Sequence, residues 1–188
     1  MAALIGCGDH GSDIVAIWRR RFLGPLELYD DDPAKGMRPS TACAEPAYLG
    51  VNAPEGRLEL WQRVGLLEAP PALVDPTLIG AIAAREGAIV APGVIALHSV
   101  HIGVHTHVNY GASLTRTTVG DFVTIGPGAV ICGGVAIEDL VLVGAGATVC
   151  DRVRIGTGCV IGAGAIVPPC SVIPPHTKVV GVWKGVPA

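Results

Sequence analysis

The sequence is poor in aromatic and in charged residues. Only 4% of the residues are Phe, Trp or Tyr and only 15% are charged, whereas half are hydrophobic. This balance argues against a disordered chain, which needs few apolar residues and many charges. The 26 glycines and 15 prolines argue against a bundle of long helices, because both residue types interrupt helices. The abundant Val, Ile, Leu and Ala favour strands and tight packing.

Other features are missing too. The net charge is −3 and the longest basic run is Arg19-Arg20-Arg21, so we expect no nucleic-acid partner. The six cysteines show no C-x-x-C spacing, so we expect free thiols, no metal site and a cytoplasmic location. Charges interrupt the first apolar stretch, which argues against a signal peptide. Residues 155–177 are uncharged, but four prolines and four glycines argue against a membrane span.

The first residues have the pattern of a nucleotide-binding unit. A short apolar run, MAALI, passes into GCGDHG, and SDIVAIWRRRF then predicts a helix that starts at Ser12 or Asp13. Glycines in this context let a backbone approach a phosphate, and the helix N-terminus supplies free N–H groups. The alternative is that the glycines only make a tight turn.

An acidic cluster follows about 20 residues later, where LELYDDD predicts a strand that ends in carboxylates. A carboxylate at this distance commonly accepts a hydrogen bond from a ribose hydroxyl. PAYLGVNAP then predicts another strand, GRLELWQRVGLL a helix, and the Pro-rich LLEAPPALVDP a boundary. Together these segments predict a Rossmann-like α/β subdomain over residues 1–75.

A six-residue repeat fills the rest of the chain. Fourteen consecutive units start at Val90, and the first residue of each is Val, Ile or Leu, except for Ala96. The fifth residue is always small or β-branched, and one unit, LTRTT, has only five residues. We interpret the repeat as a parallel β-helix over residues 76–188, in which three units close one coil and the first and fifth side chains point inward.

The whole chain resembles the bacterial hexapeptide-repeat sugar acyltransferases, which include UDP-amino-sugar N-acetyltransferases and sialic acid O-acetyltransferase-like proteins. The resemblance is carried by GCGDHG, LYDDD, HTHVNYGAS, GDFVTIGPGAVICGGVAI and the closing GVPA. It implies a left-handed β-helix that binds acetyl-CoA between neighbouring subunits of a homotrimer. It also implies that the N-terminal subdomain holds a nucleotide-sugar.

The resemblance further implies roles for particular residues. Substrate-binding residues would be Gly6, Gly8, His10, Gly11, Asp30, Asp31 and Asn109. Residues that contact CoA would be Gly144, Ala145, Gly162, Ala163, Lys178 and Lys184. No metal is expected.

The family's catalytic base is a His followed by an acid, at the third and fourth positions of one unit. Those positions hold Arg116 and Thr117 of LTRTT, and an arginine stays protonated in proteins. We assign the missing residue of this unit to its sixth position. Four histidines lie just upstream, all at outward positions: His98, His101, His105 and His107.

The candidate catalytic residues are therefore His98, Arg116, His105 and His107. His98 lies 18 residues before Arg116, so we expect it one coil below, where it could replace the base. Arg116 could instead anchor a carboxylate or phosphate of the substrate.

The function expected from this combination is acyl transfer from CoA to the amine or hydroxyl of a nucleotide-linked sugar or other small molecule. One alternative is a non-catalytic binding trimer that keeps the scaffold without the base. Another is a transferase for a weakly basic amine or hydrazine, which needs no histidine base.

Overall fold

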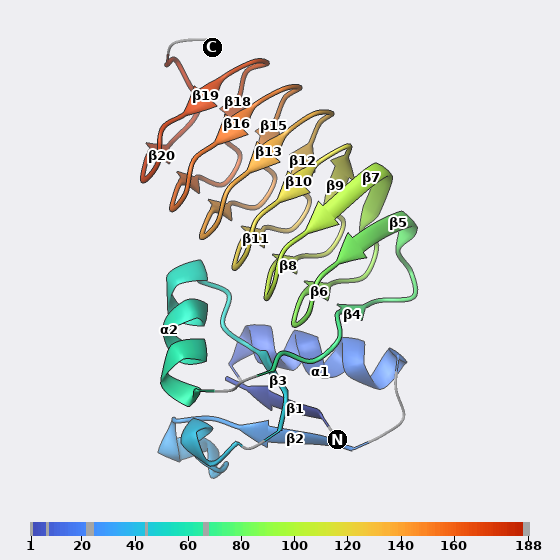
Figure 1. The fold of residues 1–188 in the computed structure, drawn as a ribbon, viewed down its shortest axis with the longest axis vertical. Coiled ribbons are helices and arrows are strands. Elements are labelled where there is room, and N and C mark those ends of the chain that lie inside the picture. The colour runs from blue at the N-terminus through green and yellow to red at the C-terminus, as the bar shows by residue number, and fades with distance from the viewer. Residues whose placement is uncertain (1, 7, 22–24, 44, 66–67, 186–188) are drawn as a thin grey trace.

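The computed structural model describes residues 2–6, 8–21, 25–43, 45–65 and 68–185. The chain forms a small α/β subdomain that continues into a long β-helix (Figure 1). The subdomain covers one end of the β-helix, and the C-terminal coils lie farthest from it (Figure 1).

The subdomain contains a three-stranded parallel sheet in the order β2-β1-β3. Its elements are β1 (Ala2–Ile5), α1 (Asp9–Arg21), β2 (Leu26–Tyr29), the 3₁₀ turns η1 (Pro33–Lys35) and η2 (Ser40–Ala42), β3 (Ala47–Leu49) and α2 (Pro54–Val64). The prediction that the first helix starts at Ser12 or Asp13 is wrong, since α1 begins at Asp9. The Ser12 N–H already donates to the Gly8 carbonyl, so the helical turn closes before Ser12.

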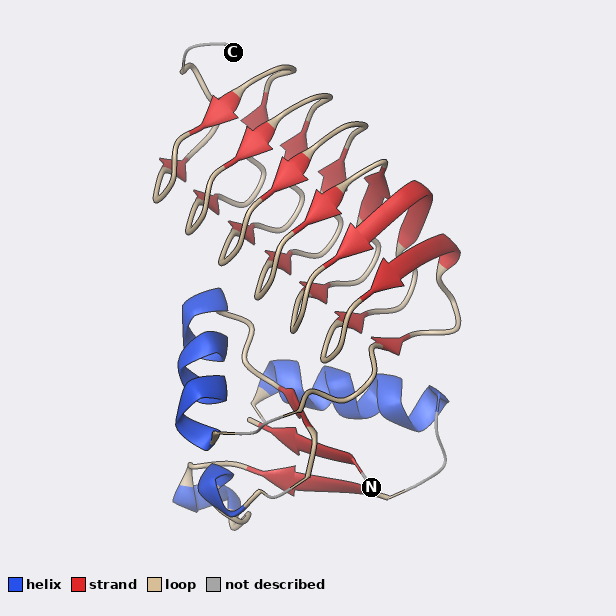
Figure 2. Ribbon diagram, in the orientation of Figure 1, coloured by secondary structure: helices blue, strands red, loops and turns tan. Residues whose placement is uncertain are grey.

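The β-helix consists mostly of two-residue strands joined by tight turns (Figure 2). Its strands are β4 (Leu73–Val74), β5 (Ile79–Ala84), β6 (Ile89–Val90), β7 (Ile95–Ile102), β8 (His107–Val108), β9 (Ser113–Thr115), β10 (Thr118–Val119), β11 (Thr124–Ile125), β12 (Val130–Ile131), β13 (Ala136–Ile137), β14 (Leu142–Val143), β15 (Thr148–Val149), β16 (Arg154–Ile155), β17 (Val160–Ile161), β18 (Ile166–Val167), β19 (Val172–Ile173) and β20 (Lys178–Val179). All their pairings are parallel, as the stacking of coils requires.

The coils have three sides. Side 1 contains β9, β12, β15 and β18; side 2 contains β10, β13, β16 and β19; side 3 contains β4, β6, β8, β11, β14, β17 and β20. The strand β7 is longer and runs along sides 1 and 2, because it pairs with both β9 and β10. The described strand β4 at Leu73–Val74 already pairs within side 3, next to the expected boundary.

The interior of the prism follows the repeat. First-position residues such as Val143 and fifth-position residues such as Ala147 are fully buried in one continuous core. The predicted inward positions are therefore confirmed for these units. No coil could bury this apolar surface by itself, so the stacking of coils supplies the stability.

Three columns of turn residues join the sides. Each column holds residues with left-handed backbone, and we name the columns by their members. Corner A, between sides 1 and 2, contains His98, Arg116, Gly134, Arg152 and Cys170. Corner B, between sides 2 and 3, contains Phe122, Leu140, Gly158 and His176. Corner C, between sides 3 and 1, contains Gly111, Gly128, Gly146 and Gly164.

The five-residue unit LTRTT loses a turn residue at corner A. Arg116 alone has left-handed backbone there, and the next residue, Thr117, is fully buried. Thr118 instead starts β10 and faces outward, so the prediction that the sixth residue is missing is wrong. Because Thr117 takes the inward place that a fifth residue normally fills, the core register is preserved while the turn shortens.

The two parts of the chain share an apolar core. It joins Leu4 of β1 and Ile14 and Ile17 of α1 to Leu73 and Ile89 of the first coils. The helix α1 thereby covers the end of the prism that would otherwise expose this surface to water.

Arg57 of α2 adds a buried polar contact between the two parts. Its side chain is fully buried and donates to the carbonyl oxygens of Val51 at 2.8 Å, Asn52 at 3.1 Å and Val123 at 2.8 Å. It also reaches the Thr124 hydroxyl at 3.1 Å, and that hydroxyl donates to Asn52 at 2.6 Å. Burial lowers the pKa of Arg57 to about 9, so the guanidinium stays charged at neutral pH.

We expect Arg57→Met to lower the free energy of unfolding by about 2 kcal/mol, because the Val51, Asn52 and Val123 carbonyl groups lose a charged donor, although Asn52 and Val123 each keep one other donor. The midpoint of urea unfolding measures this change. Arg63→Met is the matched control on the same helix. Its exposed ion pair with Asp31 should contribute less than about 1 kcal/mol. Equal losses in the two variants would contradict the role of Arg57.

Candidate functional site

A cavity of about 530 Å³ lies at the carboxyl ends of the subdomain's strands. Its lining residues are Ile5, Gly6, Gly8, Asp30, Asp31, Lys35, Gly50, Val51, Gly56, Glu59, Leu60 and Arg63. In open parallel sheets this edge is the usual place for a ligand. The structure therefore brings together four predicted residues of the nucleotide site, namely Gly6, Gly8, Asp30 and Asp31.

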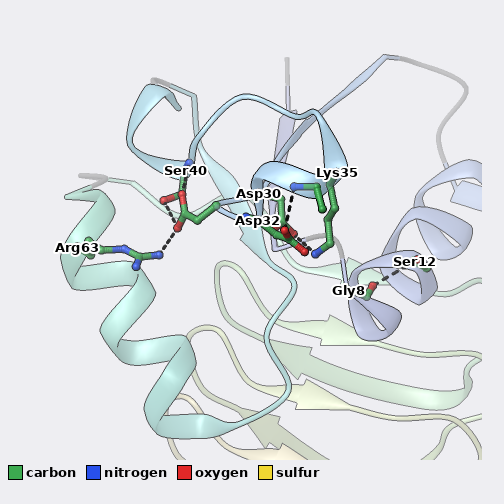
Figure 3. A network of polar contacts seen from close by, with 9 residues as sticks. Gly8, Ser12, Asp30, Asp32, Lys35, Ser40 and Arg63 are labelled. Atoms are coloured by element: carbon green, nitrogen blue, oxygen red, sulfur yellow. Dashed lines mark hydrogen bonds and ion pairs between the residues drawn. The ribbon is translucent and has the colours of Figure 1, made fainter.

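Asp30 is held at the end of β2. Its Oδ1 accepts the Asp32 N–H at 2.8 Å, and its Oδ2 accepts from the Lys35 ammonium at 2.7 Å (Figure 3). The carboxylate is mostly buried, at 8% exposure. Lys35 thus places a positive charge on the rim of a cavity that would otherwise be acidic.

Asp31 ties the loop after β2 to α2. It accepts the N–H and the hydroxyl of Ser40, each at 2.8 Å, and a hydrogen bond from Arg63 (Figure 3). The Ser40 N–H and then the Ser40 hydroxyl lower the pKa of Asp31, so it stays ionised. Both carboxylates are therefore held by hydrogen bonds, and Asp30 is the more buried, with a side-chain exposure of 9% against 42% for Asp31.

Sequence reasoning missed Lys35, Gly50, Glu59 and Arg63. Gly50 follows β3 directly, and a Cβ at this position would lie 1.9 Å from the Gly6 carbonyl oxygen. It would also lie 3.1 Å from the Gly11 Cα, inside α1. The only sequence signal was a glycine directly after an apolar strand, which marks a close backbone approach. Gly11 is buried at this contact and does not line the cavity.

We expect Gly50→Ala to destabilise the protein strongly, because the added methyl group would overlap backbone atoms that cannot move cheaply. Gly56→Ala is the matched control in the same cavity. Its Cβ would approach only the Val51 side chain, at 3.3 Å, and alanine favours the helix. Thermal unfolding should show a large loss for Gly50→Ala and little change for Gly56→Ala. Similar melting temperatures for the two variants would show that the close approach does not constrain the fold.

His105 and His107 lie between the β-helix and α2. They point away from the prism, as predicted, but their exposures are only 0% and 1%. The His105 ring packs between Trp61 at 4.5 Å and Phe122 at 5.4 Å, and His107 Nδ1 is 3.4 Å from the Arg57 guanidinium. The burial assigns both side chains to the contact between the subdomain and the β-helix.

Burial, and then the charge of Arg57, lowers the pKa of His105 from 6.5 to about 4. The folded protein therefore resists protonation of His105 in a range where the unfolded chain accepts the proton. We expect the free energy of unfolding to fall as the pH drops from about 6.5 towards 4. Urea unfolding at several pH values should show a smaller pH dependence for His105→Asn, whatever its absolute stability. His98→Asn, at an exposed position, should keep the pH dependence of the original protein.

His98 and Arg116 are neighbours at corner A, as the 18-residue spacing predicts. The Arg116 N–H donates to the carbonyl oxygens of His98 at 2.8 Å and Leu97 at 3.1 Å. Both side chains are exposed. The Arg116 side chain runs the other way along the axis, towards Gly133 of the next coil. His98 therefore remains a predicted base without a described partner for its ring.

The remaining predicted substrate residues are not at the cavity. The Asn109 Nδ2 donates to the Ile125 carbonyl at 3.0 Å, and the residue is 5% exposed, so this side chain fastens one coil to the next. The His10 side chain lies outside the described part of the structure.

The predicted CoA residues follow corner C. Ala145 and Ala163 are exposed beside Gly146 and Gly164, where an added Cβ would meet no atom within 4 Å. Gly144 and Gly162 instead face the next coil, since a Cβ at Gly144 would lie 2.5 Å from the Ala163 nitrogen. Lys178 and Lys184 are exposed near the C-terminal end of this column. Among the described residues, no group of three or more His, Cys, Asp or Glu is arranged to hold a metal ion.

Residues 116–151 match the family of bacterial transferase hexapeptide proteins (six repeats). The matched segment lies within the β-helix. A comparison with curated proteins found no match. The hexapeptide β-helix begins before the matched segment and continues after it, because strands from β4 to β20 stack in the same manner.

Solved structures share the whole fold. The acetyltransferase domain of PglB from Neisseria gonorrhoeae has a TM-score of 0.84 and 21% identity, with 100% of this chain and 98% of that chain covered. A mutant GDP-perosamine N-acetyltransferase from Caulobacter crescentus, in complex with CoA and GDP-perosamine, gives 0.83 and 20%, with 96% and 93% covered. WeeI from Acinetobacter baumannii gives 0.78 and 20%, with 96% of each chain covered. The predicted α/β subdomain followed by a left-handed β-helix is confirmed.

Proposed function

We propose that this protein transfers an acyl group from CoA to the amine or hydroxyl of a nucleotide-linked sugar. The observation that carries the proposal is the presence of two features in one chain. One is the strand-end cavity of the subdomain, and the other is the hexapeptide β-helix. The similar protein from C. crescentus, with the same two parts, was crystallised with CoA and a nucleotide-sugar.

The strand-end cavity would hold the nucleotide. Asp30 at the end of β2 would accept a hydrogen bond from a ribose hydroxyl, as a carboxylate there commonly does. The Gly6 and Gly8 backbone and the start of α1 would face the phosphates, where the helix N-terminus favours negative charge.

Corner C would hold acetyl-CoA. Its exposed Ala145, Gly146, Ala163 and Gly164 leave the backbone open for a long pantetheine arm to approach. Lys178 and Lys184 would meet the phosphates of CoA, as point charges suited to this contact. The donor then lies on the β-helix while the acceptor's nucleotide lies in the subdomain.

The active site would lie between subunits of a homotrimer. In the described chain α2 contacts corner B through Phe122. Arg116 and His98 lie at a different corner, corner A. Within one subunit, the strand-end cavity therefore does not lie beside Arg116 and His98. Side 1 also exposes apolar Val130, Ile166 and Val182, a surface that a neighbouring subunit would cover.

We also propose a cytoplasmic location, because the donor is a cytoplasmic metabolite and the five described cysteines are free thiols. No described helix combines the length and the apolar character that a membrane crossing requires.

The identity of the base divides the catalytic alternatives. Arg116 stays protonated, and Thr117 points into the prism, where it cannot orient a catalytic group. Either His98 replaces the base, or the acceptor is a weakly basic amine that needs none. The third alternative is a binding trimer without turnover. It is favoured by the presence of Arg116 and Thr117 where the resemblance implies a histidine and an acid.

Release of free CoA from acetyl-CoA, in the presence of UDP-, GDP- and dTDP-linked amino sugars, tests the proposal. If His98 is the base, His98→Ala should lower the rate by about 10²–10⁴-fold while CoA binding stays intact. His101→Ala is the matched control, since His101 is also exposed but lies on β7 beyond the turn. Its rate should stay within about twofold of the original.

Other outcomes identify the alternatives. A rate that stays unchanged in His98→Ala and flat across the histidine pH range would indicate an acceptor that needs no base. CoA binding by calorimetry without any turnover would indicate the binding trimer. Absence of both CoA binding and CoA release would contradict the proposed function.

A further inference from the structure

Corner A has a pocket of about 280 Å³ that the nucleotide cavity and the CoA column do not include. It is lined by Arg116, Gly133, Gly134, Asp151 and Arg152. The two arginines lie two coils apart at corner A, and the glycine pair belongs to the coil between them. The pocket therefore has an arginine at each end, and the backbone of the two glycines is accessible between them.

The backbone of Arg116 is fixed by three hydrogen bonds. Its N–H is shared between the His98 and Leu97 carbonyls, and its carbonyl accepts the Gly134 N–H at 2.9 Å. The shortened turn leaves Arg116 as the sole turn residue of its unit, with φ of 44°. The arginine is thus anchored at its base, and its side chain leaves the turn in one direction.

The Arg116 guanidinium lies over Gly133. A Cβ at Gly133 would be 2.8 Å from Arg116 Nη2 and 3.4 Å from Nε. The guanidinium can occupy this place only because residue 133 has no side chain. A Cβ at Gly134 would likewise lie 3.6 Å from Arg152 Cγ, so the second arginine borders the same floor. Its Nε donates to the Cys170 sulfur at 3.3 Å, which holds the side chain in place.

The pocket has excess positive charge. Asp151 is the only carboxylate among its lining residues, and its Oδ1 accepts the Gly133 N–H at 3.0 Å. The ion pairs found over the described residues include neither Arg116 nor Arg152. Two exposed guanidinium groups therefore face one carboxylate that is already engaged by backbone.

We infer that corner A binds a carboxylate or phosphate group between Arg116 and Arg152. A guanidinium presents paired N–H donors that match either anion in bidentate geometry, and the glycine floor lets the anion approach the backbone. The assignment of this anion to the acyl acceptor rests on the proposed function, which places the reacting group at corner A. The acceptor would then carry an acidic group near its nucleophile, in addition to its nucleotide.

Titration with inorganic phosphate at constant ionic strength, followed by two-dimensional NMR of the Gly133 and Gly134 amides, tests the site directly. We expect saturable shifts in the original protein. Arg116→Gln and Arg152→Gln should each raise the Kd for phosphate at least fivefold. Arg154→Gln is the matched control, because Arg154 is exposed on β16, in the same coil as Arg152, but does not line the pocket. Its Kd should stay within twofold.

Gly133→Ala gives a second variant that keeps both charges. The added methyl group would displace the end of the Arg116 side chain, which can move without disturbing the backbone. We expect an unchanged melting temperature and a phosphate Kd raised at least threefold. Absence of saturable shifts, an unchanged Kd in Arg116→Gln, or an equal weakening in Arg154→Gln would overturn the anion site.

Kinetics separate this inference from the proposed function. With turnover established, acceptors that carry a carboxylate or phosphate should be preferred over neutral analogues, and Arg116→Gln should remove the preference by raising KM for the acidic acceptor. If Arg116→Gln kept the same preference for acidic acceptors as the original protein, the assignment of the bound anion to the acceptor would be overturned. Phosphate binding at corner A without any CoA release would contradict the proposed function and support the site itself.

Discussion

The burial of Arg57 constrains the relation between the two halves of the protein. A cation without a carboxylate partner is costly to bury, and here carbonyl oxygens from both halves compensate for the lost water. Val51 and Asn52 lead from the strand-end cavity of the subdomain into α2, whereas Val123 and Thr124 belong to the β-helix. The same side chain therefore fixes the cavity wall and the coil beside it. Its charge also helps to keep His105 neutral.

Inside the prism, the packing decides which residues the repeat can lose. An inward position is surrounded by the coils above and below, so its loss would open a void or shift every later side chain. A turn residue contacts fewer neighbours. The unit LTRTT keeps Leu114 and Thr117 buried and gives up a residue of the turn instead. This explains how the chain can differ at corner A while the coils on either side keep their register.

The repeat made the β-helix predictable from the sequence, because its inward positions recur at a fixed period. The strand, glycine and acid pattern predicted substrate-binding residues, of which Gly6, Gly8, Asp30 and Asp31 line the cavity. The roles of Gly50 and Arg57 could not be predicted, since both depend on contacts between segments distant in the sequence. His105 and His107 looked like outer-face residues because a repeat frame shows which side chains leave the prism, but not that α2 covers them.

If the acceptor amine reacts at corner A, as proposed, the charge of Arg116 would affect its protonation. A fixed positive charge beside an amine disfavours the ammonium form, because like charges repel. Each unit by which the pKa of the ammonium falls raises the fraction of neutral, nucleophilic amine about tenfold while that pKa stays above the pH. An acceptor amine beside Arg116 would therefore lose its proton to solvent more readily. An acidic group on the acceptor would weaken this effect if it neutralised Arg116 fully. Since Asp151 already offsets the charge of Arg152, corner A would then have no excess positive charge, and the effect would be lost.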